Sequence, residues 1–109
     1  MKQIKLRGES ISSTGERITS MSILRLVTTN SPGRAIGVEE MRKRVRVLDA
    51  LDAVPRDADH VLLEDADADM LSQAIEQFPW SSASKSLLNI IDDVTKAPQA
   101  TAKLAAVDK

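Results

Sequence analysis

Only two of the 109 side chains are aromatic, Phe78 and Trp80, and the chain contains no tyrosine. Any hydrophobic core must therefore be built from aliphatic residues, and 42% of the chain is hydrophobic, which is typical of a globular protein. This length suits one domain, and because aliphatic side chains bury less area than aromatic ones, we expect moderate stability. The absence of cysteine excludes disulfides, thiolate metal sites and cysteine nucleophiles.

Apolar residues recur at spacings of three and four along four segments, which is the pattern of helices that bury one face. The segment from Asn30 to Gly33, then Pro55 and Pro79, supply helix stops. A serine-rich turn ending at Ser84 offers a cap for the last helix. The expected helices span about residues 18–29, 38–54, 67–78 and 84–95.

These patterns predict a mainly α fold, a compact four-helix domain with at most a minimal two-stranded β-ribbon. An α+β fold is the alternative, because the β-branched residues of the first helix are also typical of a strand. The predicted core consists of Met21, Leu24, Val45, Leu48, Leu71, Ile75, Leu87, Leu88 and Ile91.

The remaining segments divide the chain into an arm, a domain and a tail. Residues 1–16 are expected to form a short strand or an arm, and residues 17–95 a single helical domain. The apolar run from His60 to Glu64 predicts a strand, which we expect to pair with Ala35–Gly37. Residues 96–109 lack a packable stripe and are expected to be a disordered tail.

Charge is divided unevenly along a chain whose formal net charge is −1. Residues 1–56 carry eleven Lys and Arg against six Asp and Glu, and residues 57–109 carry four against ten. Such a split favours electrostatic contact between the halves or between neighbouring chains. The basic N-terminus is followed by no long apolar run, so we expect a soluble cytoplasmic protein with no membrane partner.

One stretch of the sequence resembles a group of viral proteins. Pro32-Gly33 precedes the segment Val38–Leu51, and Leu63–Asp67 and Trp80 follow downstream. This pattern, over roughly residues 20–95, is similar to that of small uncharacterised proteins encoded in tailed phages and prophages. The resemblance implies a small accessory or assembly protein, located in the host cytoplasm or in the virion, and it carries no functional residue.

An acidic run resembles a calcium-binding loop. Asp65, Asp67, Asp69 and Glu76 reproduce the 1, 3, 5, 12 ligand spacing of such a loop. The sixth position, where the loop turns sharply and glycine is needed, is Met70. The residues after it also carry a clean helical stripe. We therefore expect these acids to complement a helix N-terminus, with no metal bound.

A basic cluster on the second predicted helix suggests a nucleic-acid alternative. Arg42, Lys43, Arg44 and Arg46 are candidates to contact DNA in a helix-turn-helix arrangement. The connection over residues 30–37 is longer than that motif uses, and the whole chain is slightly acidic. A solvated helix face, or one that docks onto acidic protein, is the favoured interpretation.

No motif predicts catalysis, a cofactor or a small-molecule substrate. His60 is the only histidine and lies near Asp57, Asp59 and Glu64, but no second imidazole or activated nucleophile accompanies it. We expect His60 to be a surface or strand-edge residue. Trp80 is expected to fold back onto the core, with its indole N–H donating to a carbonyl.

The favoured function is a non-catalytic protein-interaction or assembly module that self-associates, most simply as a dimer. The motive is the number of apolar residues outside the main stripes, Ile23, Leu26, Val47 and Val54 among them. The alternative is a nucleic-acid-binding regulator that uses the basic helix. The residues expected to bind the protein partner are Ile23, Val47, Arg42, Lys43 and Arg46.

Overall fold

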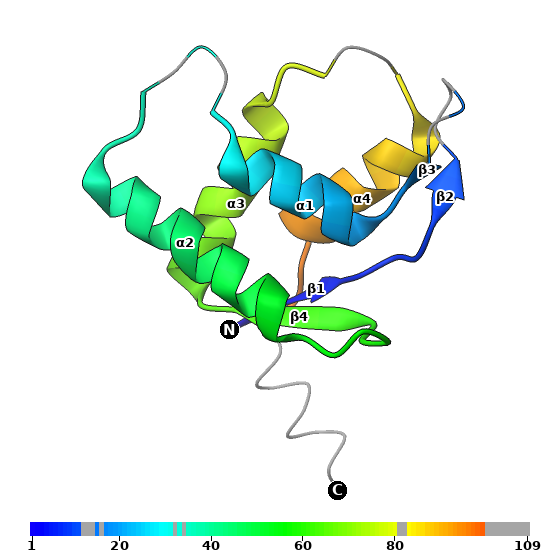
Figure 1. Cartoon of the computed structure of the whole chain (residues 1–109), viewed down its shortest axis with the longest axis horizontal. Coiled ribbons are helices and arrows are strands. Elements are labelled where there is room, and N and C mark those ends of the chain that lie inside the picture. Colours follow the sequence, from blue (N-terminus) through cyan, green and yellow to red (C-terminus); the bar gives the residue numbers. More distant parts are fainter. Residues whose placement is uncertain (12–14, 16, 32, 34, 81–82, 100–109) are drawn as a thin grey trace, which may run out of the picture.

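The fold class predicted from the sequence is confirmed by the computed structural model (Figure 1), which describes residues 1–11, 15, 17–31, 33, 35–80 and 83–99. The described helices are α1 (Ser20–Thr29), α2 (Val38–Ala53), α3 (Asp65–Gln77) and α4 (Lys85–Thr95). The strands are β1 (Lys2–Lys5), β2 (Ser10–Ile11), β3 (Arg17–Ile18) and β4 (His60–Leu63).

Local capping explains where two of the helices begin. Thr19 and Ser22 form a reciprocal capping box, in which each side chain accepts from the other's backbone N–H at 3.0 Å. Helix α1 therefore starts two residues later than expected, and Ile18 belongs to β3. The Ser84 hydroxyl accepts from the Leu87 N–H at 3.3 Å, which confirms the expected cap of α4.

The main sheet joins segments that are distant in the sequence. Strand β4 pairs antiparallel with β1, so that Ile4 lies opposite Val61 and both side chains are buried. The expected pairing of β4 with residues 35–37 is wrong. The alternation of β1 points Ile4 into the core, and this burial stabilises the longer-range pairing. A second pairing, of β2 with β3, involves only two residues from each strand.

The C-terminal tail that we predicted at residues 96–109 is ordered against the sheet over its first residues. The Gln3 N–H donates to the Pro98 carbonyl at 2.9 Å, and Gln99 lies opposite Lys2 as an antiparallel bridge. Pro98 and Gln99 thus lie along β1, and residues 100–109 of the predicted tail lie outside the described residues. None of the helices in the described part of the chain is long and apolar enough to cross a membrane.

One aliphatic core fills the space between the helices and the main sheet. Of the predicted core residues, Leu24, Leu71 and Ile75 are fully buried. Val45 and Leu88 were predicted wrongly, since they are 49% and 56% exposed. Met21, Leu87 and Ile91 are partly buried against the core, and Leu48 is half-buried. The buried apolar residues are Ile4, Ile23, Leu24, Val27, Val47, Leu51, Val61, Leu63, Ala68, Met70, Leu71, Ile75, Ile90 and Val94.

Candidate functional site

Helix α2 is rotated about its axis relative to the sequence prediction. Its fully buried residues are Arg44, Val47 and Leu51, so Val47 faces the core and Val45 faces outward. A helix turns about 100° per residue, and a shift of two positions moves a side chain almost to the opposite face. Ile23 is buried as well, at 7% exposure. The expectation that Ile23 and Val47 form an exposed partner-binding surface is therefore wrong.

Arg44 is a buried structural residue. Its side chain is only 5% exposed, and Nη1 donates to the carbonyl oxygens of Val27, Thr28 and Asn30 at 2.9, 3.1 and 3.1 Å. Nη2 and Nε donate to one carboxylate oxygen of Glu40 at 2.7 and 3.0 Å. These carbonyls belong to the C-terminal end of α1, where no helical partner exists for them. The nucleic-acid role considered for Arg44 is therefore wrong.

Arg46 holds the start of α3 against α2. Its guanidinium makes a bidentate contact with Asp67, with Nη2 2.8 Å from Oδ1 and Nε 3.0 Å from Oδ2. The Asp67 side chain is 4% exposed, whereas that of Arg46 is 53% exposed. The hydrogen bond to Asp67 raises the pKa of Arg46 above its ordinary value. The basic cluster is thus reduced to exposed Arg42 and half-buried Lys43.

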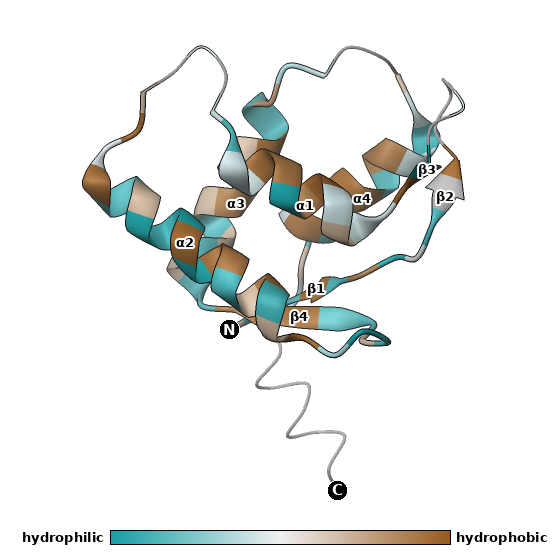
Figure 2. Cartoon of the chain, viewed as in Figure 1, coloured by the Kyte–Doolittle hydropathy of each residue, from teal (hydrophilic) through white to brown (hydrophobic). Residues whose placement is uncertain are grey.

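The outer face of α2 carries the largest group of exposed apolar side chains on any one described helix. Val38, Met41 and Val45 are 63%, 51% and 49% exposed, and their spacing places them on one stripe. We call these three residues the α2 stripe. They line a shallow hollow of about 490 Å³ together with Arg42 and Arg46. Figure 1 shows α2 along one edge of the molecule, and Figure 2 shows hydrophobic residues continuing to its N-terminal end.

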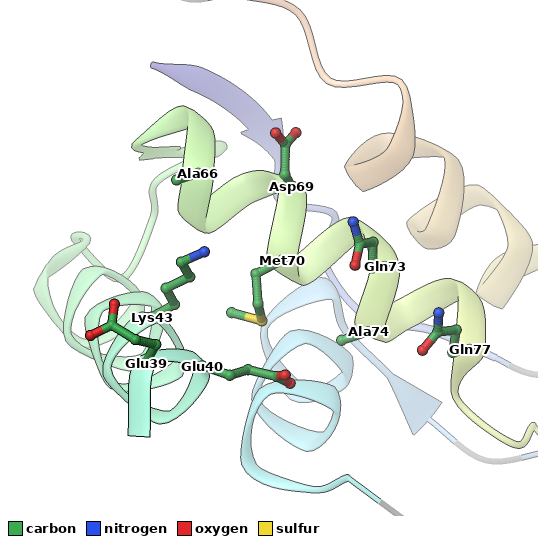
Figure 3. A pocket seen from close by; sticks show the side chains of 9 residues that line it. All are labelled: Glu39, Glu40, Lys43, Ala66, Asp69, Met70, Gln73, Ala74 and Gln77. Carbon is green, nitrogen blue, oxygen red and sulfur yellow. The ribbon is translucent and has the colours of Figure 1, made fainter. Parts of the chain in front are cut away.

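A second hollow lies between α2 and α3 and has a volume of about 560 Å³ (Figure 3). Met70 lies between the two helices, and the Lys43 side chain reaches from α2 toward the first turns of α3. Gln73 and Gln77 follow one another along α3 and form the opposite rim. The polar groups that line this hollow are amides, carboxylates and one amine, and no paired acid and nucleophile lies among them.

A third hollow, of about 730 Å³, lies between the main sheet and the end of α4. His60 borders it, with Nδ1 2.8 Å from Oδ1 of Asp59, and it lies on β4 at the surface, which confirms the expected strand-edge position. The hydrogen bond from His60 lowers the pKa of Asp59. Asp93 also borders the hollow, but Arg7 holds both of its carboxylate oxygens.

Trp80 has the structural role expected of it. The indole N–H donates to the carbonyl of Ile75 at 3.1 Å, and the ring packs 4.6 Å from that of Phe78, centroid to centroid. Both aromatic side chains pack against the aliphatic core and are partly buried. Trp80 is therefore a core-lining residue, not an exposed anchor for a partner.

The acidic run does not form a calcium loop. Residues 65, 67, 69 and 76 all lie on the continuous helix α3. Asp67 points away from the other three, and Glu76 lies about 10 Å beyond Asp69 along the axis, so the four side chains cannot surround one ion. Asp67 is buried against Arg46, while Asp65 and Asp69 are exposed. Among the described residues, no group of three or more His, Cys, Asp and Glu side chains is placed to hold a metal. The expectation that the acids complement a helix start fits Asp65 and Asp67, which lie in the first turn.

We expect millimolar calcium to leave the melting temperature of the protein unchanged, because a specific site would stabilise the folded state by mass action. Differential scanning calorimetry with calcium, and with magnesium as a matched divalent control, measures this directly. A rise in melting temperature with calcium alone would show that the acidic run binds the ion in an arrangement other than the helix.

Comparison with models of protein families, with curated proteins and with solved structures gives no match.

Proposed function

We propose that this protein is a non-catalytic interaction module that self-associates through the outer face of α2. The observation that carries the proposal is the exposure of Val38, Met41 and Val45 on one face of a well-packed helix. Apolar side chains grouped on a surface and bordered by charged residues are typical of protein contacts. An assembly role, as the resemblance to phage accessory proteins implies, rests on the sequence pattern alone.

The burial pattern of α2 supports a helix that contacts partners on both of its faces. The inner face already packs on α1, α3 and β4 through Val47 and Leu51. Nothing in the described part of the chain packs over the outer face. Since a second copy supplies an identical apolar surface, it is the simplest partner of matching chemistry.

Nucleic acid is the less favoured partner. Of the four cations considered for that role, Arg44 is buried in hydrogen bonds and Arg46 is paired with Asp67. Arg42 and Lys43 remain, and two cations neutralise too few phosphates for binding at physiological salt. The outer face of α2 also carries Asp49 and Asp52, which would repel phosphates.

The surface is small, so we expect weak association. A helix of 16 residues is about 24 Å long. The area that two faces of that length bury lies at the low end of the range for specific interfaces. We therefore expect a dissociation constant of about 10 to 100 μM. Association of this strength is seen at high protein concentration or where other contacts bring copies together.

Replacing Val45 with Asp should abolish self-association, because each copy would bury an unpaired carboxylate in the contact. Sedimentation velocity from roughly 10 μM to 1 mM, a range that brackets the expected dissociation constant, measures the mass of the wild type and the variant. We expect the wild type to shift toward the dimer mass and Val45→Asp to remain monomeric. Because Val45 is exposed in the single chain, the helix content and melting temperature should be nearly unchanged.

Leu88→Asp is the matched control, since Leu88 is an equally exposed apolar residue on α4. It should associate as the wild type does. A wild-type protein that remains monomeric over the whole range would refute the proposed function. Equal loss of association in the two variants would mean that an added charge weakens association wherever it lies, and would contradict a contact specific to the α2 stripe.

A further inference from the structure

We infer that the partner on the outer face of α2 is a second copy whose α2 runs antiparallel, with Arg42 of each copy opposite Asp49 of the other. This inference rests on the proposed function and adds the orientation of the partner and the control of the contact by ionic strength. It follows from the position of these residues around α2 and from the ionic interactions of the neighbouring charges.

The residues on the outer face are arranged almost symmetrically about Val45. Met41 and Arg42 precede it by four and three residues, and Leu48 and Asp49 follow it by three and four. A two-fold axis that relates antiparallel helices at Val45 places residues before this position opposite residues after it in the second copy. The two Val45 side chains then meet at the axis.

The angular positions agree with this arrangement. At about 100° per residue, Arg42 and Asp49 lie on one side of Val45, and Met41 and Leu48 lie on the other. In an antiparallel pair related by a two-fold axis, each side of a helix meets the same side of its copy. Met41 therefore contacts Leu48 of the second copy, and Arg42 contacts Asp49 of the second copy. One flank of the contact is apolar and the other is ionic.

Arg42 and Asp49 are both exposed, and neither forms an ion pair within the described part of the chain, whereas neighbouring charges of α2 do. Arg46 is held by Asp67, and Asp52 is held by Arg25. Arg42 and Asp49 are thus exposed charges without an ion pair in the described structure, one turn before and one turn after Val45, and the antiparallel pair brings them together. A parallel two-fold pair would instead bring each side of the helix against the opposite side of its copy, so Arg42 would lie beside Met41 of the copy and would not meet Asp49.

Charge reversal tests the pairing. By sedimentation velocity at low salt, Arg42→Glu or Asp49→Arg alone should raise the dissociation constant of the dimer about tenfold, because two attractive contacts become repulsive. The double variant Arg42→Glu/Asp49→Arg should return to within about threefold of the wild type. Added salt should weaken the wild-type dimer and strengthen the dimer of each single variant, since screening acts on attraction and repulsion alike.

Lys85→Glu is the matched control, because it changes the net charge as Arg42→Glu does but lies at the start of α4, in a part of the fold away from α2. It should change the dissociation constant by less than about twofold. A double variant that stays as weak as the single variants, or single variants that associate normally, would overturn the antiparallel pairing.

Disulfide cross-linking of single-cysteine variants tests the register independently. Because the chain has no native cysteine, any disulfide must join the two introduced residues. Under mild oxidation, Val45→Cys should form a disulfide-linked dimer, because facing residues at the axis approach within about 4.4–6.8 Å between Cα atoms. Val38→Cys should not, since in the proposed pair the two copies of position 38 are about 20 Å apart along the axis.

The outcomes separate the inference from the proposed function. Cross-linking at Val38→Cys or Met41→Cys, but not at Val45→Cys, would refute this register while leaving self-association through α2 intact. A wild-type protein that remains monomeric refutes both. Cross-linking at Val45→Cys together with rescue by the double charge reversal supports the antiparallel pair.

Discussion

Replacing Arg44 with Met is expected to lower the free energy of unfolding by about 3–5 kcal/mol, the range found when one partner of a buried ionic network is removed. Met keeps much of the side-chain length and apolar character, so the variant removes the guanidinium with little change in packing. The carbonyls of Val27, Thr28 and Asn30 would lose their donor, and Glu40 would lose a charged partner.

For a domain of this size the loss corresponds to a fall in melting temperature of roughly 10–25 °C. Thermal and urea unfolding followed by the fluorescence of Trp80 measures the effect without a second tryptophan to confuse the signal. Arg44→Lys should fall between the wild type and Arg44→Met, because an ammonium keeps the charge but cannot hold the same planar set of acceptors.

Arg42→Met is the matched control on the same helix. Arg42 is exposed and takes no part in the hydrogen bonds that Arg44 makes, so its replacement should change the free energy of unfolding by less than about 0.5 kcal/mol. If Arg44→Met were as stable as Arg42→Met, the buried network would contribute nothing and the end of α1 would have to be satisfied by other donors.

Local signals predict the helices of this fold well. Proline and cap residues act on the backbone within a few residues of their own position, so Pro55, Pro79 and Ser84 mark helix ends near their true positions. The β1–β4 pairing is different, because it joins residues almost 60 positions apart. Nothing local distinguishes β1 from the short extended segment at 35–37 as a partner for β4.

The orientation of α2 could not be predicted because its sequence contains two competing faces. Val38, Met41 and Val45 form one apolar stripe, and Val47 and Leu51 begin another on the opposite side. Counting apolar residues favours the first stripe. The second is buried because it places Arg44 against the end of α1, and an arginine is normally assigned to the surface when no structure is known.

The same error in orientation concealed the candidate site. The sequence correctly indicated that more apolar residues are present than one stripe per helix can bury. Of the residues it named, Leu26 is exposed as expected and Val54 is partly buried, but Ile23 and Val47 are buried. In the structure, Val45 is exposed and Val47 is buried. The symmetry about Val45 can be recognised in the sequence only when it is known that Arg44 is buried, because this fixes which face of α2 points outward.

Replacing Leu71 and Leu88 with alanine should affect the free energy of unfolding very differently. The sequence predicts both to be core residues, but only Leu71 is buried in the structure. Leu71 is fully buried on α3, which packs on α1, α2 and α4, whereas Leu88 is 56% exposed on α4. Leu71→Ala should lower the free energy of unfolding by about 3–4 kcal/mol, since the rigid surroundings leave a cavity, and Leu88→Ala by less than about 0.5 kcal/mol.

Urea unfolding of the two alanine variants, with a common m-value fitted to Trp80 fluorescence, gives both values on one scale. Each variant removes the same atoms from the same residue type in a helix, so helix propensity and side-chain entropy largely cancel in the comparison. The difference then reports burial alone. Equal destabilisation of the two variants would mean that Leu88 is covered in solution, either by a rotation of α4 or by a contact between copies. In the second case the cost of Leu88→Ala would grow with protein concentration, because an intermolecular contact contributes to stability through mass action, whereas the cost of Leu71→Ala would stay constant.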